Sequence, residues 1–288
     1  MSADLVALNE TWRKDRDTRC RDPNGWLSLA GLHFLVDGSQ RVGAHSGDAV
    51  RFDVPSTSMP HESLGTVLVD TAAQSVEFVR DALFTALPVE VGGSVVTDAV
   101  PRVLSWSEDA PTLVKVGTLT WFIVKRGERF AIRLRDRDNA VLRDFRGIES
   151  WPIDLSYRVT ATLVPHAGGP LEVRMPTAAG TVDVETSPGD LHFSLQGHDL
   201  TLRPTLSGNR LQLVIADGTT NHETYGGGRF VYTELPDADG KVIVDFNQAY
   251  NPPCVFTPFC TCPLPTKENR LKLRIEAGEK MYHGGAAH

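Results

Sequence analysis

The sequence predicts a mainly β protein with a short N-terminal helix, a β-sandwich-like N-terminal half and a larger β-barrel-like C-terminal half. From Trp26 onward, short runs rich in β-branched and aromatic residues alternate with turns that contain Asp-Gly, Ser-Gly, Gly-Gly or Arg-Gly. Many short strands at such spacing are typical of β-sandwiches and β-barrels. Helical periodicity nearly vanishes after Trp26, so we expect one helix followed by strands, with a surface loop or a single helical turn at residues 136–146.

The predicted helix covers residues 4–17. Leu5, Leu8 and Trp12 recur there at three- and four-residue spacing, so they would share one face of a helix. An Asp-Pro-Asn-Gly turn follows and ends the helical pattern. We therefore assign residues 1–22 to an N-terminal helical segment.

The remaining chain is expected to form two β subdomains, residues 23–148 and residues 149–288. In the first, residues 119–136 form the clearest hairpin, because two β-rich arms flank a Lys-Arg-Gly-Glu turn. In the second, strands resume after Trp151, and the last of them are RFVYTEL, KVIVDFN and LKLRIEAG. No internal repeat of fixed period is evident.

The sandwich-like subdomain has a faint likeness to phosphopeptide-binding forkhead-associated domains. Arg41 and the Ser-x-x-His spacing of Ser58 and His61 stand where such a domain would hold phosphate contacts. The Asn-Gly loop of those domains is missing here. The alternative is an ordinary turn in an all-β domain.

Composition favours a soluble, cytoplasmic globular protein. The 288 residues carry a net charge of −7, which argues against nucleic acid as a partner because binding to phosphates needs a basic face. No apolar run is long enough for a membrane span, and the N-terminus is charged where a signal peptide would be apolar. Four cysteines do not make a disulfide scaffold, so we expect reduced thiols. The oligomeric state stays open.

Polar, cyclic and glycine residues are concentrated in residues 217–282, which suggests a built site. This segment contains the motifs TYGGGR, DFNQAYNPPC, TCPLPTKENRL and AGEKMY. Together with the earlier WLSLAGLHFL, IRLRDRDNAVLRDFRGI and WPIDLSYRV, they closely resemble the bacterial and archaeal domain-of-unknown-function family 1684. The resemblance covers nearly the whole chain, but it implies no established activity.

Arg229 follows three consecutive glycines, which permit positive φ angles and the close approach of another group. A backbone concavity beside an arginine suits a carboxylate or phosphate. The alternative is a tight turn in which Arg229 pairs with an internal acid. Nearby, His222 could transfer a proton near neutral pH, or it could be a hydrogen-bonded structural residue. Tyr225 would form a wall of the site.

The motif VIVDFNQAYNPP predicts a strand that ends in a stiff segment. On that strand, Asp245 and Asn247 would project to the same side. Burial of Asp245 is costly unless it is paired, and Arg229 is the natural candidate partner. Tyr250 and Asn251 come next, held by two prolines that either fix a site or simply end the strand.

The three C-terminal cysteines, Cys254, Cys260 and Cys262, could suggest a metal. Their C-x5-C-x-C spacing does not match the paired knuckles of structural zinc sites, so we predict no metal and no cofactor. Cys254 could act as a nucleophile if His222 served as its base. The default is a buried, reduced cysteine that packs as a small apolar residue.

Three functional hypotheses follow. The first is a polar pocket for a small anionic or polar metabolite, in the manner of a hydrolase-type enzyme. Its catalytic candidates are His222, Asp245 and Cys254, and its binding candidates are Tyr225, Arg229, Asn247, Tyr250, Asn251 and Asn269. The second is a non-catalytic ligand- or protein-binding β module. The third is a satisfied polar network that only holds the fold together.

Overall fold

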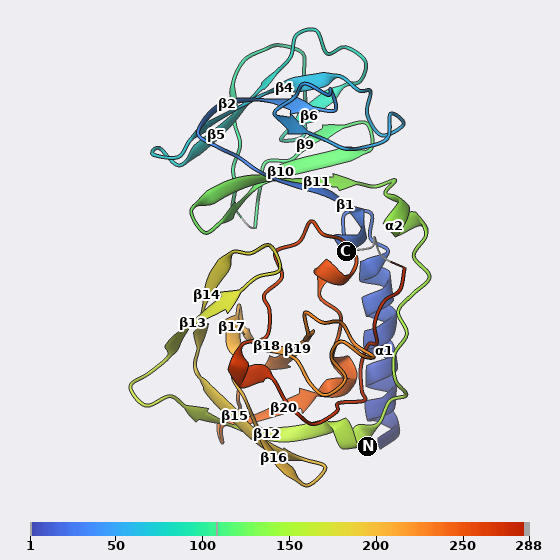
Figure 1. Cartoon of the computed structure of the whole chain (residues 1–288), viewed down its shortest axis with the longest axis vertical. Coiled ribbons are helices and arrows are strands. Elements are labelled where there is room, and N and C mark those ends of the chain that lie inside the picture. The colour runs from blue at the N-terminus through green and yellow to red at the C-terminus, as the bar shows by residue number, and fades with distance from the viewer. Residues whose placement is uncertain (1, 108, 285–288) are drawn as a thin grey trace. The chain divides into compact units, whose positions relative to one another are not determined.

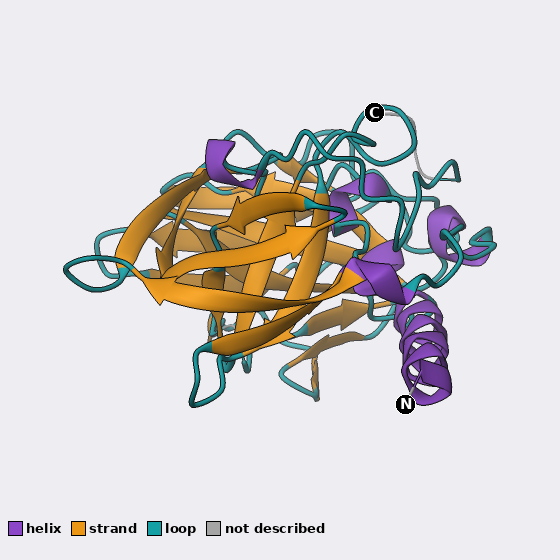
Figure 2. Ribbon diagram, turned by 90° about the horizontal axis from the view of Figure 1, so that it is seen from below, coloured by secondary structure: helices purple, strands orange, loops and turns teal. Residues whose placement is uncertain are grey.

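The computed structural model describes residues 2–107 and 109–284 (Figure 1). Strands make up most of the regular structure, which confirms the prediction of a mainly β protein (Figure 2). The described chain forms two compact units. The central unit runs from Arg21 to Phe145, and the terminal unit joins the residues up to Cys20 with those from Arg146 onward.

Helix α1 (Ser2–Cys20) is the long helix of the terminal unit and extends beyond the predicted residues 4–17 at both ends. Asp4 in its first turn and Arg19 in its last turn complement the helix dipole. Its buried residues are Asn9, Arg16 and Cys20, whereas Leu8 is 52% exposed. Of the predicted apolar face, Leu5 and Trp12 are half-buried and Leu8 is exposed, so two of the three residues that α1 buries, Asn9 and Arg16, are polar.

The central unit contains two mainly antiparallel sheets and a short helix, α2 (Ala140–Arg143). One sheet has the order β1-β11-β10-β9-β6-β7 and the other the order β3-β2-β4-β5-β8. The first comprises β1 (Leu29–Phe34), β6 (Val89–Val91), β7 (Ser94–Val96), β9 (Val114–Val116), β10 (Leu119–Arg126) and β11 (Arg129–Asp136). The second comprises β2 (Gly38–Gly43), β3 (Val50–Arg51), β4 (Ser63–Asp70), β5 (Ser75–Arg80) and β8 (Arg102–Val103).

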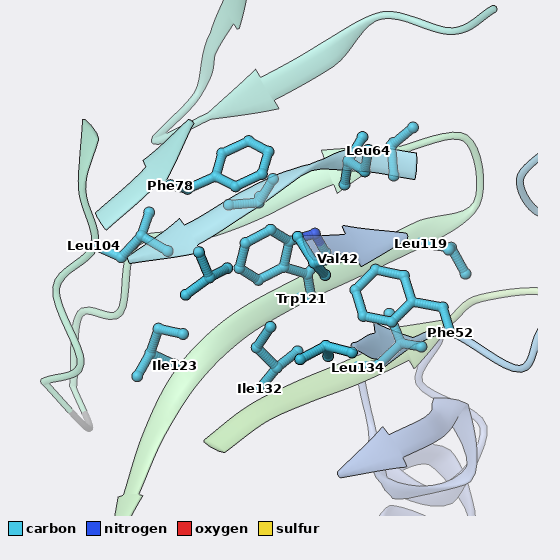
Figure 3. Close-up of a cluster of buried hydrophobic side chains, with 14 of the residues drawn as sticks. Val42, Phe52, Leu64, Phe78, Leu104, Leu119, Trp121, Ile123, Ile132 and Leu134 are labelled. Carbon is cyan, nitrogen blue, oxygen red and sulfur yellow. The ribbon is translucent and has the colours of Figure 1, made fainter. Parts of the chain in front are cut away.

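The β10–β11 hairpin has the predicted position and carries Trp121, the largest fully buried side chain. Its ring meets Phe78 edge-on at 5.2 Å between centroids and lies 6.3 Å from Phe52 (Figure 3). Residues from both sheets share this one hydrophobic core. Strand β5 buries alternate residues in this core, whereas β10 and β11 also bury Phe122, Val124 and Ala131 on their other face.

The terminal unit contains sheets of four, three and two strands. Their orders are β16-β15-β12-β20, β17-β18-β19 and β13-β14, so the described strands form open sheets and not the expected barrel. The strands are β12 (Arg158–Pro165), β13 (Leu171–Pro176), β14 (Val182–Ser187), β15 (Gly189–Leu195), β16 (His198–Leu202), β17 (Thr205–Ser207), β18 (Arg210–Ile215), β19 (Arg229–Glu234) and β20 (Lys241–Asp245).

Two local predictions in the terminal unit were wrong. Strand β20 ends at Asp245, and Asn247 belongs to the 3-10 helix η3 (Phe246–Gln248), which the Asp245 side chain caps. The segment LKLRIEAG, expected as a strand, is extended but irregular. Leu271 N–H donates to Ala216 O and Gly218 N–H donates to Leu273 O, but the chain bends at Lys272 and Leu273, so no regular strand forms.

Candidate functional site

Arg229 is fully buried and clamps the last described segment of the chain. Its Nη2 atom donates to Asp217 Oδ2 at 2.7 Å and to Ile275 O at 3.0 Å, and its Nη1 atom donates to Ala277 O at 2.5 Å. Burial lowers the pKa of the guanidinium, while Asp217 opposes this shift. The partner expected for Arg229 was Asp245. That expectation was wrong, because the acid that faces it comes from the turn after β18.

The glycine turn before Arg229 is required by close packing. Gly228 has φ +84°, and a Cβ atom there would lie 2.4 Å from Ile215 O and 2.5 Å from a Pro265 side-chain atom. Only glycine combines that backbone conformation with such close contact. The turn therefore delivers Arg229 to the start of β19 with its side chain directed inward.

Asp245 lies in a second polar cluster at the end of β20. Its Oδ1 atom accepts from the backbone and side-chain amides of Asn247, and its Oδ2 atom accepts from Asn9 Nδ2 at 3.0 Å. Arg158 Nε lies 3.6 Å from the same carboxylate. Asn247 also exchanges two hydrogen bonds with the backbone of Asp154. This cluster fastens α1 to the strand through Asn9.

A third cluster joins α1 to the segments around residues 251 and 279. Arg16 Nε donates to Glu279 Oε1 at 2.9 Å, and Arg16 Nη2 donates to Asn251 O at 3.0 Å. Glu279 Oε2 accepts from Asn251 N–H at 2.7 Å. The Tyr250 ring centroid lies 4.7 Å from the Arg16 guanidinium carbon. Burial lowers the pKa of Arg16, but the Glu279 carboxylate more than offsets this and raises it above its ordinary value.

Asn269 is buried in the terminal unit and binds backbone. Its Oδ1 atom accepts from Arg203 N–H at 2.7 Å, and its Nδ2 atom donates to Arg203 O at 2.9 Å. The Arg203 side chain in turn pairs with Asp190 at 2.8 Å. Asn269 thereby joins the end of β16 to the 3-10 helix η5 (Lys267–Asn269).

Cys254, Cys260 and Cys262 are buried and reduced, and they gather beside Tyr225. Cys254 N–H donates to Cys262 Sγ at 3.3 Å. A hydrogen bond with Cys262 and burial raise the pKa of the Cys254 thiol far above its ordinary value. The bond with Cys254 lowers the pKa of Cys262, but a bond with Cys260 and burial together raise it to about 12. The thiols of Cys254 and Cys262 therefore lack the thiolate character of a nucleophile.

We expect the native thiols to be almost inert to alkylation at pH 8. With a pKa of about 12, roughly one Cys262 thiol in ten thousand is ionised at that pH, before burial slows attack further. Iodoacetamide labelling should be at least about 100-fold slower in buffer than in urea, and its rate should rise with pH. One thiol that reacts rapidly in the native protein would contradict this expectation.

His222 is exposed in the turn after Asp217, where its N–H donates to Thr219 O. Its neighbour Glu223 binds Arg274 at 2.7 Å. Among the described residues, no three His, Cys, Asp or Glu side chains form a group that could hold a metal ion. The candidate residues thus fall into separate buried clusters, with His222 on the surface.

Two of the three phosphate-contact candidates of the central unit, Arg41 and Ser58, bind acidic side chains of the same unit. Arg41 pairs with Asp81 at 3.0 Å and lies 3.6 Å from Asp48. Ser58 is buried, and its Oγ atom donates to Asp136 Oδ2 at 2.5 Å. His61 is exposed.

A cavity of about 220 Å³ lies against α1 in the terminal unit, and we call it the α1 pocket. Its wall is formed by residues of α1, of the segment that follows Arg146, and of the C-terminal motif: Trp12, Arg13, Arg16, Asp17, Ile148, Ser150 and Glu279. The third polar cluster forms one side of this pocket through Arg16 and Glu279. Tyr250 and Asn251 therefore lie next to the wall.

Arg13 and Asp17 were missed as candidates from the sequence. Both belong to the charged run WRKDRD and lie off the face of Leu5, Leu8 and Trp12. Arg13 is half-buried, and its Nη2 atom donates to Trp151 O at 2.8 Å. Among the described residues it has no ion pair, and its buried Nε atom has no hydrogen-bond partner. Burial lowers the pKa of Arg13, although the negative charges of Glu279 and Asp245 act to raise it.

Comparison with known proteins gives a family but no activity. The search of curated proteins found no match. A similar solved structure is the solution NMR structure of an uncharacterized protein of Haloarcula marismortui, which is 31% identical, with 48% of this chain and 78% of that chain covered and a TM-score of 0.41. In the part of the chain that the structure describes, no helix is long and apolar enough to cross a membrane. Residues 143–280 match the model of the family described as "Protein of unknown function (DUF1684)", and through this segment the chain belongs to that family.

Proposed function

We propose that the terminal unit binds a small anionic ligand in the α1 pocket. The observation that carries the proposal is the state of Arg13, which lines the pocket with a buried Nε donor that has no partner within the described chain. A guanidinium that is partly desolvated and lacks a counter-ion gains from an anion placed against it. A carboxylate or a phosphate would supply both the charge and the missing acceptor.

The other wall residues support a compact ligand. The cavity of about 220 Å³ is below the roughly 300–1,000 Å³ of sites for drug-sized molecules, so the ligand should contain few atoms. Arg16 is already neutralised by Glu279, which leaves Arg13 as the anchor. Ser150 offers a hydroxyl, and Trp12 offers a flat apolar side.

In this proposal most of the candidate residues predicted from the sequence support the wall of the α1 pocket and do not line it. Tyr250 and Asn251 hold Arg16 and Glu279 in place, while Arg229, Asp245 and Asn247 hold the segments from which the wall is built. Asn269 bonds to Arg203, which does not line the pocket. The proposed function is binding, because the buried thiol of Cys254 has a raised pKa and does not suit nucleophilic catalysis.

An anion panel with matched variants tests the proposal. Acetate, malonate, phosphate and sulfate are added to wild type, Arg13→Gln and Lys14→Gln, with chloride at equal ionic strength as the baseline. Lys14 is exposed on the same helix and does not line the pocket. A ligand at about 100 times its Kd stabilises the native state by about 2.7 kcal/mol, which raises the Tm by roughly 5 °C or more.

We expect one of the anions to raise the Tm of wild type and of Lys14→Gln, and to leave that of Arg13→Gln unchanged. The two variants lose the same charge, so a general electrostatic effect would act on both. An equal rise in all three proteins would place the anion elsewhere and refute the proposal.

A further inference from the structure

A second depression of the terminal unit has the properties of a different ligand site. It has a volume of about 840 Å³ and lies between the end of the β15–β16 hairpin and residues 270–276. We call it the basic groove. Its wall includes Arg270, Lys272, Arg274 and His198, and Glu276 is the one acid among the described residues that line it. This excess of cations stands out in a chain whose net charge is −7.

The cations of the groove differ in how far they are neutralised. Arg274 is paired twice, with Glu223 at 2.7 Å and with Glu276 at 2.9 Å. The Arg270 side chain donates a hydrogen bond to Pro265 O at 3.1 Å and makes no ion pair within the described part of the chain. Lys272 is exposed and has no ion pair among the described residues. Two positive charges, those of Arg270 and Lys272, are therefore available to a ligand.

The floor of the groove is apolar. Leu200, Leu271 and Leu273 are partly buried and pack against the hydrophobic core of the unit, yet they still line the groove. Tyr157 closes one wall, and its hydroxyl accepts a hydrogen bond from Gln196 Nε2 at 2.9 Å. A leucine floor beneath a cationic rim complements a molecule that is apolar along its body and anionic at one end.

We propose that the basic groove binds an amphipathic organic anion, with its apolar chain on the leucines and its carboxylate or phosphate at Arg270 and Lys272. The volume lies within the range of metabolite-sized sites, unlike that of the α1 pocket. The proposal does not depend on the α1 pocket, because the two cavities share no lining residue.

Titration calorimetry with decanoate tests this inference, with two comparison ligands. Decan-1-ol keeps the apolar chain and lacks the charge, and citrate keeps the charge and lacks the chain. We expect decanoate to bind at least about tenfold more tightly than either, since both parts of the groove contribute. Equal affinity for decanoate and citrate would show attraction by charge alone and overturn the proposal, and equal affinity for decanoate and decanol would overturn it as well.

Matched charge reversals locate the site. Lys272→Glu should weaken decanoate binding at least about tenfold, and Lys267→Glu should change it less than about twofold. Both variants replace a lysine with a glutamate and so have the same net charge. The side chain of Lys267 is 91% exposed, lies five residues away from Lys272 in the sequence and does not line the groove. Arg13→Gln should bind decanoate as wild type does. Equal weakening by the two lysine variants would refute the assignment, provided that thermal unfolding shows both to be folded.

Discussion

Replacing Arg229 with alanine is expected to destabilise the terminal unit by about 3–5 kcal/mol, which is enough to unfold a marginally stable unit. The variant would leave the Asp217 carboxylate buried without its counter-ion at 2.7 Å. It would also remove the donor that holds the carbonyl groups of Ile275 and Ala277. Urea unfolding followed by tyrosine and tryptophan fluorescence measures the loss as a lower midpoint.

Arg274→Ala is the matched control for this prediction. Arg274 also makes two ion pairs, with Glu223 and Glu276, but its side chain is 46% exposed, so solvent screens both pairs and its loss should lower the unfolding midpoint only slightly. Adding Asp217→Asn to Arg229→Ala should recover part of the stability, because the unpaired buried charge disappears. Similar midpoints for Arg229→Ala and Arg274→Ala would contradict the role of Arg229 as a buried clamp.

The second large effect is expected for Glu279→Gln, at about 3 kcal/mol. Arg16 is buried in α1, and its charge is compensated by Glu279 at 2.9 Å. Glutamine keeps the shape but not the charge, so α1 would lose its main attachment to the C-terminal motif. Hydrogen exchange measured by mass spectrometry should show faster exchange along residues 2–20, beside which the C-terminal segment lies in Figure 1.

Glu276→Gln provides the control for Glu279→Gln. Glu276 is three residues earlier in the same segment, but it is exposed, and its one ion pair among residues 2–107 and 109–284 is with Arg274. Its replacement should leave both the unfolding midpoint and the exchange of α1 close to those of wild type. Unchanged exchange of α1 in Glu279→Gln would show that the helix is held by other contacts.

The fold class could be predicted because it depends on local patterns. Alternating burial and turn residues recur along the chain, and the β10–β11 hairpin lies where its turn predicted it. The buried face of α1 could not be predicted in this way. Its polar residues Asn9 and Arg16 are buried because Asp245 and Glu279, more than 200 residues away, face them.

For the candidate residues, too, local features could be predicted from the sequence and distant partners could not. Gly228 and its turn could be predicted from the glycine run, since positive φ and close packing are local requirements. The partner of Arg229 could not, because three-dimensional packing selected Asp217 over the equally plausible Asp245. Arg13 was missed since a charged helix residue usually faces solvent, and only the packed structure shows that its Nε atom is buried.

Native mass spectrometry of the protein purified from its own host tests the central claim, that the α1 pocket holds a small anion, most directly. We expect the native mass of wild type and of Lys14→Gln to exceed the denatured mass by one small anionic molecule, and Arg13→Gln to lack this increment. An increment that Arg13→Gln retains in full would contradict the claim, since the bound molecule would then lie outside the α1 pocket.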